Sequence, residues 1–508
     1  MHHRIPILAA LFLLFLSSCK STSSSNPAIT EKELLANVFA LASPEMAGRE
    51  PGRPGHLLAA QYTAGVLEAA GVSPAALDSV GNPSWYQQVP LLRIARETHA
   101  DITLRTMQGT VNLCSTNGSL LVLHPGALRS DTLKLDGQVY DAVHAIVDPY
   151  TGYNDLEGLD LQGKIVLLEI RTPSASSTGI NLSDSMNSLY RNPTTALRIR
   201  LQNLYKAGVA AIVLIPDTQL ERRWQYLLWL RQNLPIFQDY YDTNRIEGVD
   251  PPPVFAAHRD ALQPLLDYRA APDPETKIRP AGPIPGSDLS LTLIRKGERF
   301  TSPNVIGIVR GSDPVLADSF IVMTAHLDHL GETANSYNPG ANDNASGVSV
   351  LLEVASKLAA DPPAYSTLFL FPTAEEESFL GTIYFSLHSP IPLDAIVAEF
   401  NADEVGRIPE NPHGLAVIHS EGLKESLWEA GEKFQKENIS FMPPGSMNGF
   451  FYRSDQIIFH RLGIPAAFIT TGHFQEYHSP ADVPELIDAR MMYLTATLLD
   501  EIITIRGN

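Results

Sequence analysis

Histidine and carboxylate residues recur in the C-terminal half of this chain, each a few positions after a short apolar run. The runs cover residues 320–325, 367–371, 395–400 and 466–470, and the residues that follow them are His326 and Asp328, Glu375 and Glu376, Asp403, and His478. Imidazole and carboxylate ligands without thiolate suit zinc, and cobalt or manganese would also accept them. The pattern therefore predicts a metal centre built from several strand ends.

Asp343 lies in the loop Gly-Ala-Asn-Asp-Asn-Ala-Ser-Gly of residues 340–347, just before an amphipathic helical pattern. An aspartate in this place is ordinarily a helix N-cap. A short loop flanked by glycines can also bring one carboxylate close to two cations. If Asp343 is shared, the set divides into two half-sites, each with one imidazole, one further carboxylate and the shared aspartate. Two ions in such a site lie roughly 3.5–4 Å apart and lower the pKa of a water between them to about 7.

Glu375, Glu376 and Glu377 form an acidic run that would ordinarily be a solvated surface patch. The run comes directly after a buried strand, which favours a chemical role. Adjacent acids at a strand end can have different roles, because one can coordinate a metal while its neighbour takes a proton from water.

His326 and Asp328 share a face if the strand continues through them, whereas His329 then points away. A carboxylate that accepts the second ring N–H of a histidine orients it as a metal ligand. We therefore expect Asp328 to hold His326, and we do not expect His329 to take part.

The apolar runs are almost uninterrupted, as in strands that are buried on both faces. Amphipathic helical patterns lie between or after them, for example over residues 348–358 and 491–505. The sequence thus predicts an α/β fold, a mostly parallel mixed sheet flanked by helices. Ligands bind at the carboxyl ends of the strands in such sheets.

The pattern of predicted elements changes between residues 118 and 284, where short strands, a helix and proline clusters alternate. We expect an inserted, β-rich α/β domain there, and a discontinuous catalytic domain over residues 30–117 and 285–508. The aromatic stretch 224–241 inside the insertion is explained by core packing, with a lid over the substrate as the alternative.

The N-terminus carries a targeting pattern. Arg4 precedes an apolar run over residues 5–16, which is too short to span a bilayer and typical of a signal peptide. The run ends in Leu-Ser-Ser-Cys, which resembles a bacterial lipoprotein box, so we expect a signal peptide over 1–18, lipid on Cys19 and a flexible tether over 19–29. The protein is then an exported lipoprotein of the bacterial cell envelope, periplasmic or surface-exposed, and Cys114 has no disulfide partner.

The overall charge excludes one class of partner. The chain has 37 Lys plus Arg against 56 Asp plus Glu, a formal net charge of -19. Nucleic-acid binding requires a basic stripe, and none is visible. An acidic surface would instead favour substrates that carry a positive amine.

Taken together and in order, the motifs resemble the co-catalytic di-zinc exopeptidase family, which includes bacterial leucyl aminopeptidase, aminopeptidase Y and glutamate carboxypeptidase. The matching segments are AHLDHLG (325–331), GANDNASG (340–347), AEEESFLG (374–381), NADEVGR (401–407), SDQ (454–456) and YHSPAD (477–482). The insertion resembles a protease-associated domain, most clearly over residues 153–168 and 207–216. The fold that the resemblance implies is of the zinc-exopeptidase, phosphorylase/hydrolase-like type.

The resemblance implies a role for each motif residue. It implies two zinc ions, one held by His326, Asp343 and Asp403 and the other by Asp343, Glu376 and His478. Glu375 becomes the general base and Asp328 the residue that orients His326. The family often has a cis peptide bond after the shared aspartate, here Asp343-Asn344. Two residues depart from the family pattern, Ser378 in place of glycine and Gln456 in place of histidine.

The resemblance implies an aminopeptidase that acts on peptide or protein N-termini. A carboxypeptidase of the same fold is an alternative, with Arg453 or Arg407 as the cation for the substrate carboxylate. Cyclase relatives generally lack the insertion. The third alternative is a binding protein on an inactive scaffold, as in the transferrin-receptor relatives, which lose ligands that are all present here.

Overall fold

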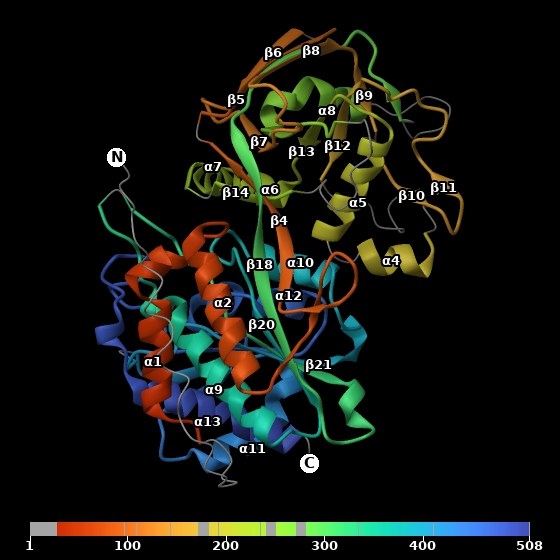
Figure 1. The fold of residues 1–508 in the computed structure, drawn as a ribbon. Helices are drawn as coiled ribbons and strands as arrows, with labels where there is room; N and C mark the ends of the chain where they lie inside the picture. Colours follow the sequence, from red (N-terminus) through yellow and green to blue (C-terminus); the bar gives the residue numbers. More distant parts are fainter. Residues whose placement is uncertain are drawn as a thin grey trace, which may run out of the picture.

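The computed structural model describes residues 28–506 apart from 96, 108, 143, 171–181, 191–192, 234, 240–249, 271–280, 334 and 410. Figure 1 shows a larger body at the bottom and a smaller one above it, connected by two long strands, β4 (Tyr86–Ile94) and β18 (Gly297–Val309). The predicted signal peptide, Cys19 and most of the tether lie outside the described residues. Cys114 is a free cysteine.

The larger body is built on a ten-stranded mixed sheet. Its strand order is β14-β4-β18-β20-β19-β21-β24-β22-β23, and β1 (Ser73–Pro74) pairs with β18. The remaining strands are β14 (Ile236–Gln238), β20 (Ser366–Phe371), β19 (Phe320–Thr324), β21 (Ile396–Ala402), β24 (Ala466–Thr470), β22 (Leu415–His419) and β23 (Ile439–Met442). The four strands β20, β19, β21 and β24 run parallel to one another. The predicted α/β class is confirmed.

Helices cover both faces of this sheet because its strands are apolar on both sides. In β20, Phe369 and Phe371 pack into one core and Leu368 and Leu370 into the other. The first core includes α1 (Glu31–Leu41), α2 (Pro54–Ala69), α9 (Gly347–Ala360), α11 (Lys424–Lys433) and α13 (Ala489–Arg506). The second includes α10 (Leu380–Leu387) and α12 (Gln456–Arg461). Each leucine buried in this way contributes about 1.5–3 kcal/mol of transfer free energy.

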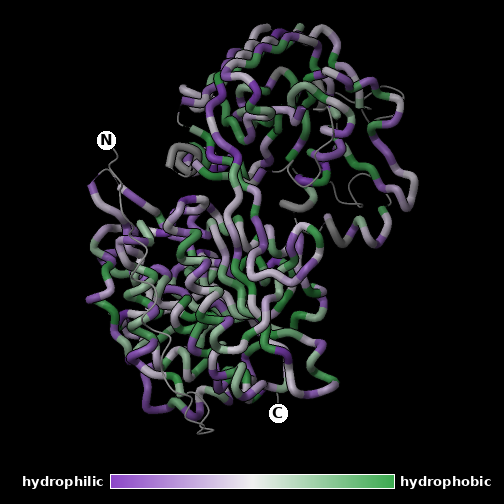
Figure 2. The backbone as a smooth tube through the Cα atoms, viewed as in Figure 1, coloured by the Kyte–Doolittle hydropathy of each residue, from purple (hydrophilic) through white to green (hydrophobic). Residues whose placement is uncertain are grey.

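The smaller body holds two larger sheets and a two-stranded sheet of β10 (Val147–Asp148) and β11 (Tyr153–Asn154). One larger sheet has the order β16-β9-β12-β13-β15-β7. Its strands β9 (Val139–Asp141), β12 (Ile165–Glu169), β13 (Ala211–Ile215) and β15 (Val254–Ala257) are parallel, and β16 (Gly282–Pro283) and β7 (Leu120–His124) lie at its edges. Helix α5 (Pro193–Lys206) connects β12 to β13 along the chain. The other larger sheet is antiparallel, with the order β6 (Gly109–Cys114), β5 (His99–Thr106), β17 (Asp288–Ile294) and β8 (Thr132–Gly137). Figure 2 shows hydrophobic segments through the interior of both bodies and hydrophilic segments mostly outside.

Strand pairing departs from the predicted domain boundaries, which otherwise stay a prediction. Strands β5, β6 and β17, all expected in the catalytic part, form one sheet with β8 of the insertion, because β17 pairs with both β5 and β8. Their alternating apolar residues are buried in the core of the smaller body, which the local pattern does not reveal. Within the aromatic stretch, Trp224 and Ile236 are buried, as core packing requires, whereas Tyr226 is exposed. Among the described residues no helix combines the length and apolarity that a membrane crossing requires.

Candidate metal centre

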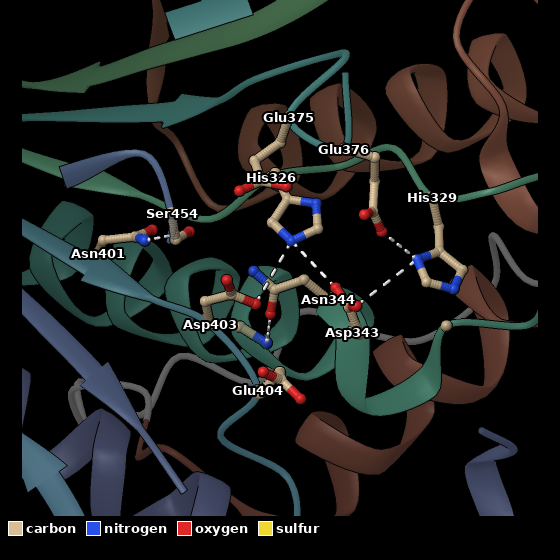
Figure 3. A network of polar contacts seen from close by, with 12 residues as sticks. His326, His329, Asp343, Asn344, Glu375, Glu376, Asn401, Asp403, Glu404 and Ser454 are labelled. Carbon is tan, nitrogen blue, oxygen red and sulfur yellow. Dashed lines mark hydrogen bonds and ion pairs between the residues drawn. The ribbon is translucent and has the colours of Figure 1, made fainter. Parts of the chain in front are cut away.

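The predicted ligands gather at the carboxyl edge of the parallel strands. Strand β19 ends two residues before His326, β21 ends at the residue before Asp403, and β20 and β24 precede Glu376 and His478. Figure 3 shows His326, Asp343 and Asp403 converging at this edge. The His326 Nε2 atom lies 3.1 Å from Oδ1 of Asp343 and 3.3 Å from Oδ1 of Asp403.

Asp343 also faces the second histidine. The Nε2 atom of His478 lies 3.3 Å from Oδ2 of Asp343 and 2.9 Å from Oε2 of Glu376. The two oxygens of one carboxylate therefore face two different imidazoles, each of which has a second carboxylate beside it. This is the arrangement that a shared aspartate between two half-sites requires.

The distances between these donor atoms are a few tenths of an ångström shorter than those around a bound zinc ion, so small movements of the side chains would admit one. A tetrahedral ion with bonds of about 2.0–2.2 Å separates its ligand atoms by about 3.3–3.6 Å. The pairs described above lie between 2.9 and 3.3 Å apart. His326, Asp343 and Asp403 are all buried, so their donor atoms are held in a fixed cradle. The donor set and its geometry fit a pair of divalent cations.

His329 lies at the site, contrary to our expectation. Its Nδ1 atom is 2.7 Å from Oε1 of Glu376 and 3.9 Å from Oδ2 of Asp343. The alternation argument was wrong here because β19 ends at Thr324, so residues 326–329 are not a strand. His329 holds one oxygen of Glu376 while the other faces His478. By distance His329 is also a possible ligand, with Asp343 and Glu376.

Asp328 contacts different groups from those expected. Its carboxylate lies 3.9 Å from Nδ1 of His326, which is closer, at 3.2 Å, to the main-chain oxygen of Asp328. The carboxylate instead accepts the backbone N–H groups of Glu375 at 3.0 Å and Glu376 at 3.4 Å. Asp328 therefore fixes the loop that carries both glutamates. The early end of β19 is again the reason.

Arg49 and Asp482 hold the loop that carries Asp343. The buried guanidinium of Arg49 donates to main-chain oxygens of five residues: Leu41, Leu327, Pro339, Gly340 and Asp343. Asp482 accepts the N–H groups of Asn342 and Asp343. Gly340 has a φ of 58°, and a Cβ there would lie 2.2 Å from the oxygen of Asp343, so glycine is required. The motifs gave no sign of the role of Arg49. The peptide bond Asp343-Asn344 is cis, as the resemblance implied.

Burial and the crowding of charge shift the pKa of His478, His326 and Glu375. Burial alone lowers the pKa of His478, but hydrogen bonds with Asp343 and Glu376 outweigh it and raise the pKa to about 10. Burial likewise opposes protonation of His326, and nearby carboxylates hold its pKa well above the usual value. Burial raises the pKa of Glu375 well above the usual value, although His326 opposes this. Without metal the centre thus holds protons, which bound cations would displace.

The two departures from the family pattern lie beside the centre. Ser378 has a φ of 73°, which explains why glycine is usual there. The amide of Gln456 accepts from Asn401 at 2.7 Å and donates to the main-chain oxygen of Phe451 at 2.7 Å. Both residues shape the surroundings and neither lies at a ligand position.

Known proteins share the region that carries the centre. Residues 304–501 match the model of peptidase family M28. Aminopeptidase YwaD of Bacillus subtilis is 31% identical over 210 residues, 39% of this chain and 43% of that protein. Aminopeptidase Y of Saccharomyces cerevisiae is 29% identical over 187 residues, 34% of this chain and 31% of that protein. The matched segments therefore span less than half the length of these relatives.

A solved structure shows likeness over a longer stretch. The structure of BSAP, a zinc aminopeptidase from Bacillus subtilis, shares 20% identity with a TM-score of 0.46, and the likeness covers 94% of this chain and 95% of that chain. The segment over residues 304–501, which carries the four strand ends and Asp343, matches the model of peptidase family M28, in agreement with the resemblance to the co-catalytic exopeptidases.

Proposed function

We propose that this protein is a zinc-dependent aminopeptidase that uses two ions to hydrolyse N-terminal peptide bonds. The observation that carries the proposal is the carboxylate of Asp343, whose two oxygens face His326 at 3.1 Å and His478 at 3.3 Å. The match to the model of family M28 and the names of the curated relatives support it. His326, Asp343 and Asp403 would hold one ion, and Asp343, Glu376 and His478 the other.

Bound zinc would supply a Lewis acid for the scissile carbonyl and would lower the pKa of the attacking water. Glu375 takes the proton from that water, because it lies next to His326 and outside the groups at ligand distance (Figure 3). Glu375 then returns the proton to the leaving amine. Asp328 and His329 position the two glutamates through the contacts described above.

The charge at the centre favours an N-terminal substrate. Asp343, Glu376, Asp403 and Glu404 crowd one small region. Burial raises the pKa of Glu404, and the charges of the nearby acids raise it further. Such a region attracts a positive amine and repels a carboxylate near the scissile bond. This arrangement favours an aminopeptidase over a carboxypeptidase.

The deciding experiment compares leucine anilide with C-terminally blocked and N-terminally blocked dipeptides, using the zinc-loaded full chain. Release of aniline and of the N-terminal residue, abolished by a chelator and restored by zinc, is the expected result. Cleavage confined to N-terminally blocked peptides with a free C-terminus would establish the carboxypeptidase instead. Metal analysis that finds no bound zinc would favour the binding protein.

Export and lipid attachment at Cys19 belong to the proposal as well, and the N-terminal sequence supports them. Replacing Cys19 with Ala should move the protein from the membrane fraction to the soluble fraction. An unchanged distribution would contradict the anchor and leave the peptidase activity unaffected.

A further inference from the structure

Arg453 is an exposed arginine held beside the metal centre. It follows a short helix, η8 (Met447–Tyr452), and its guanidinium carbon lies 5.0 Å from the ring centre of Phe450. Its neighbour Ser454 is buried and accepts a hydrogen bond of 2.7 Å from the side chain of Asn401, near the end of β21. The backbone of Arg453 is therefore anchored to the same sheet edge as the metal centre.

A histidine positions the guanidinium without neutralising it. The Nη1 atom of Arg453 lies 3.4 Å from Nε2 of His473, and Nδ1 of that ring lies 2.6 Å from Oε2 of the buried Glu404. A ring that donates its Nδ1–H to a carboxylate presents Nε2 as an acceptor. His473 thus directs Arg453 while the positive charge stays available.

Arg407 offers an internal contrast. It too lies over an aromatic ring, that of Phe474 at 4.7 Å, but its Nη1 lies 3.3 Å from Oε2 of Glu476. Among the described residues no carboxylate forms an ion pair with Arg453. Of these two cations beside the centre, Arg453 is the one free to bind an anion.

A row of stacked rings connects Arg453 to the metal centre and limits the distance between them. The ring of His478 lies 3.7 Å from that of Tyr477, which lies 4.1 Å from that of His473. With the 3.4 Å contact to Arg453, the guanidinium lies no more than about 12 Å from the ring of His478, which is within reach of a peptide of three or four extended residues.

We propose that Arg453 binds the C-terminal carboxylate of short peptides whose N-terminal bond lies at the metal centre, so that free peptides of about three or four residues are the preferred substrates. This inference rests on the proposed aminopeptidase function. The surrounding acids explain the need for such a cation, because the chain has a net charge of -19 and Glu404 and Glu476 lie nearby. A carboxylate would otherwise be repelled.

The experiment compares Leu-Gly-Gly with its C-terminal amide as substrates of the zinc-loaded full chain. We expect kcat/KM to fall about tenfold on amidation, with the loss mainly in KM, because a charge-assisted contact at a partly exposed site is removed. In Arg453→Gln the ratio of acid to amide should approach one, and Arg453→Lys should keep part of it. Both substrates are measured with the same variant, so a smaller amount of folded enzyme lowers both rates equally and leaves their ratio unchanged.

Arg310→Gln is the matched control, since Arg310 lies over the ring of Phe320 at the opposite end of β19 and should leave the ratio unchanged. Equal rates for acid and amide in the wild type, or a ratio that survives in Arg453→Gln, would overturn the inference while leaving the aminopeptidase intact. A ratio lost only in Arg407→Gln would also overturn it. Failure to release leucine from either peptide or from leucine anilide would instead refute the proposed function.

Discussion

Two groups of parallel strands in this molecule end beside a buried arginine that binds main-chain oxygens. In the larger body Arg49 binds the loops around β19 and α9. In the smaller body Arg200 donates to the oxygens of His144, Glu169 and Ile170 at the end of β12. In both places one guanidinium donates to several main-chain carbonyl groups at once and so ties together segments that are separate in the sequence.

The two edges differ in the side chains that follow the strands. The pKa of Arg49 falls to about 10 through burial, opposed by the charges of four acids: Asp343, Asp482, Asp328 and Glu376. Of the described residues, both groups that could hold a metal ion lie at this edge and none lies at the end of β12. A parallel sheet edge therefore provides a place for a site, and the residues after each strand decide whether one forms.

The largest expected effect comes from Glu375. Replacing Glu375 with Gln keeps the size of the side chain and removes its ability to take a proton, so kcat should fall by about 10²–10⁴. Zinc content should not change, because no ligand is lost. The measurements are leucine anilide turnover and metal analysis, with Glu377→Gln as the control that keeps most of its activity. Normal turnover in Glu375→Gln would refute the assignment.

Substitution of the two buried arginines, Arg49 and Arg200, should distinguish the sheet edge that carries the metal centre from the edge that does not. Arg49→Met should lower the midpoint of thermal unfolding by about 5–10 °C, because several carbonyl groups lose their donor, and should also release zinc. Arg200→Met should cost similar stability and keep the zinc. Loss of zinc from both variants would show that the two edges are not independent.

Acid should weaken the metal centre. In the metal-free protein the pKa of His478 is raised to about 10, so zinc must displace its proton at neutral pH. Affinity for zinc should therefore fall as the pH is lowered from 8 to 6, roughly in line with proton competition. Titration calorimetry in buffers of different ionisation enthalpy measures the protons released. Binding that releases none would contradict the raised pKa.

The stability of the metal-free protein should depend on pH in the opposite direction to its affinity for zinc. A pKa raised from 6.5 to about 10 means that the contribution of His478 is fully present below pH 6.5 and is lost as the pH rises through about 10. The unfolding midpoint of chelator-treated protein should accordingly fall between pH 7 and 10. His478→Gln removes this part of the pH dependence. A flat profile in the wild type would rule out the coupling.

The smallest effect is expected at Ser378. Its φ of 73° strains a residue with a Cβ, so Ser378→Gly should stabilise the protein by about 0.5 kcal/mol after the entropy cost of glycine. Thermal unfolding measures the change. A destabilised variant would show that the hydroxyl or the stiffer backbone matters more than the strain.

Much of the centre could be predicted because its signals are local. An apolar run predicts a buried strand, and a histidine or acid just after it must lie at the sheet edge. This argument placed His326, Asp403 and His478 correctly beside their partners. The separate argument from strand alternation was wrong for His329 and for the contact of Asp328, because it assumed that a strand continues where β19 has already ended.

The sequence by itself determined the α/β class, the strands that line up at one edge and the metal-capable residues on them, because these follow from short-range patterns of apolar and ionisable residues. Only the tertiary structure decided that Arg49 holds the loop of Asp343, that His329 braces Glu376 and that β5 and β6 belong to the smaller body. Each of these depends on contacts between segments far apart in the chain. Such contacts are set by how the elements pack, which no local pattern specifies.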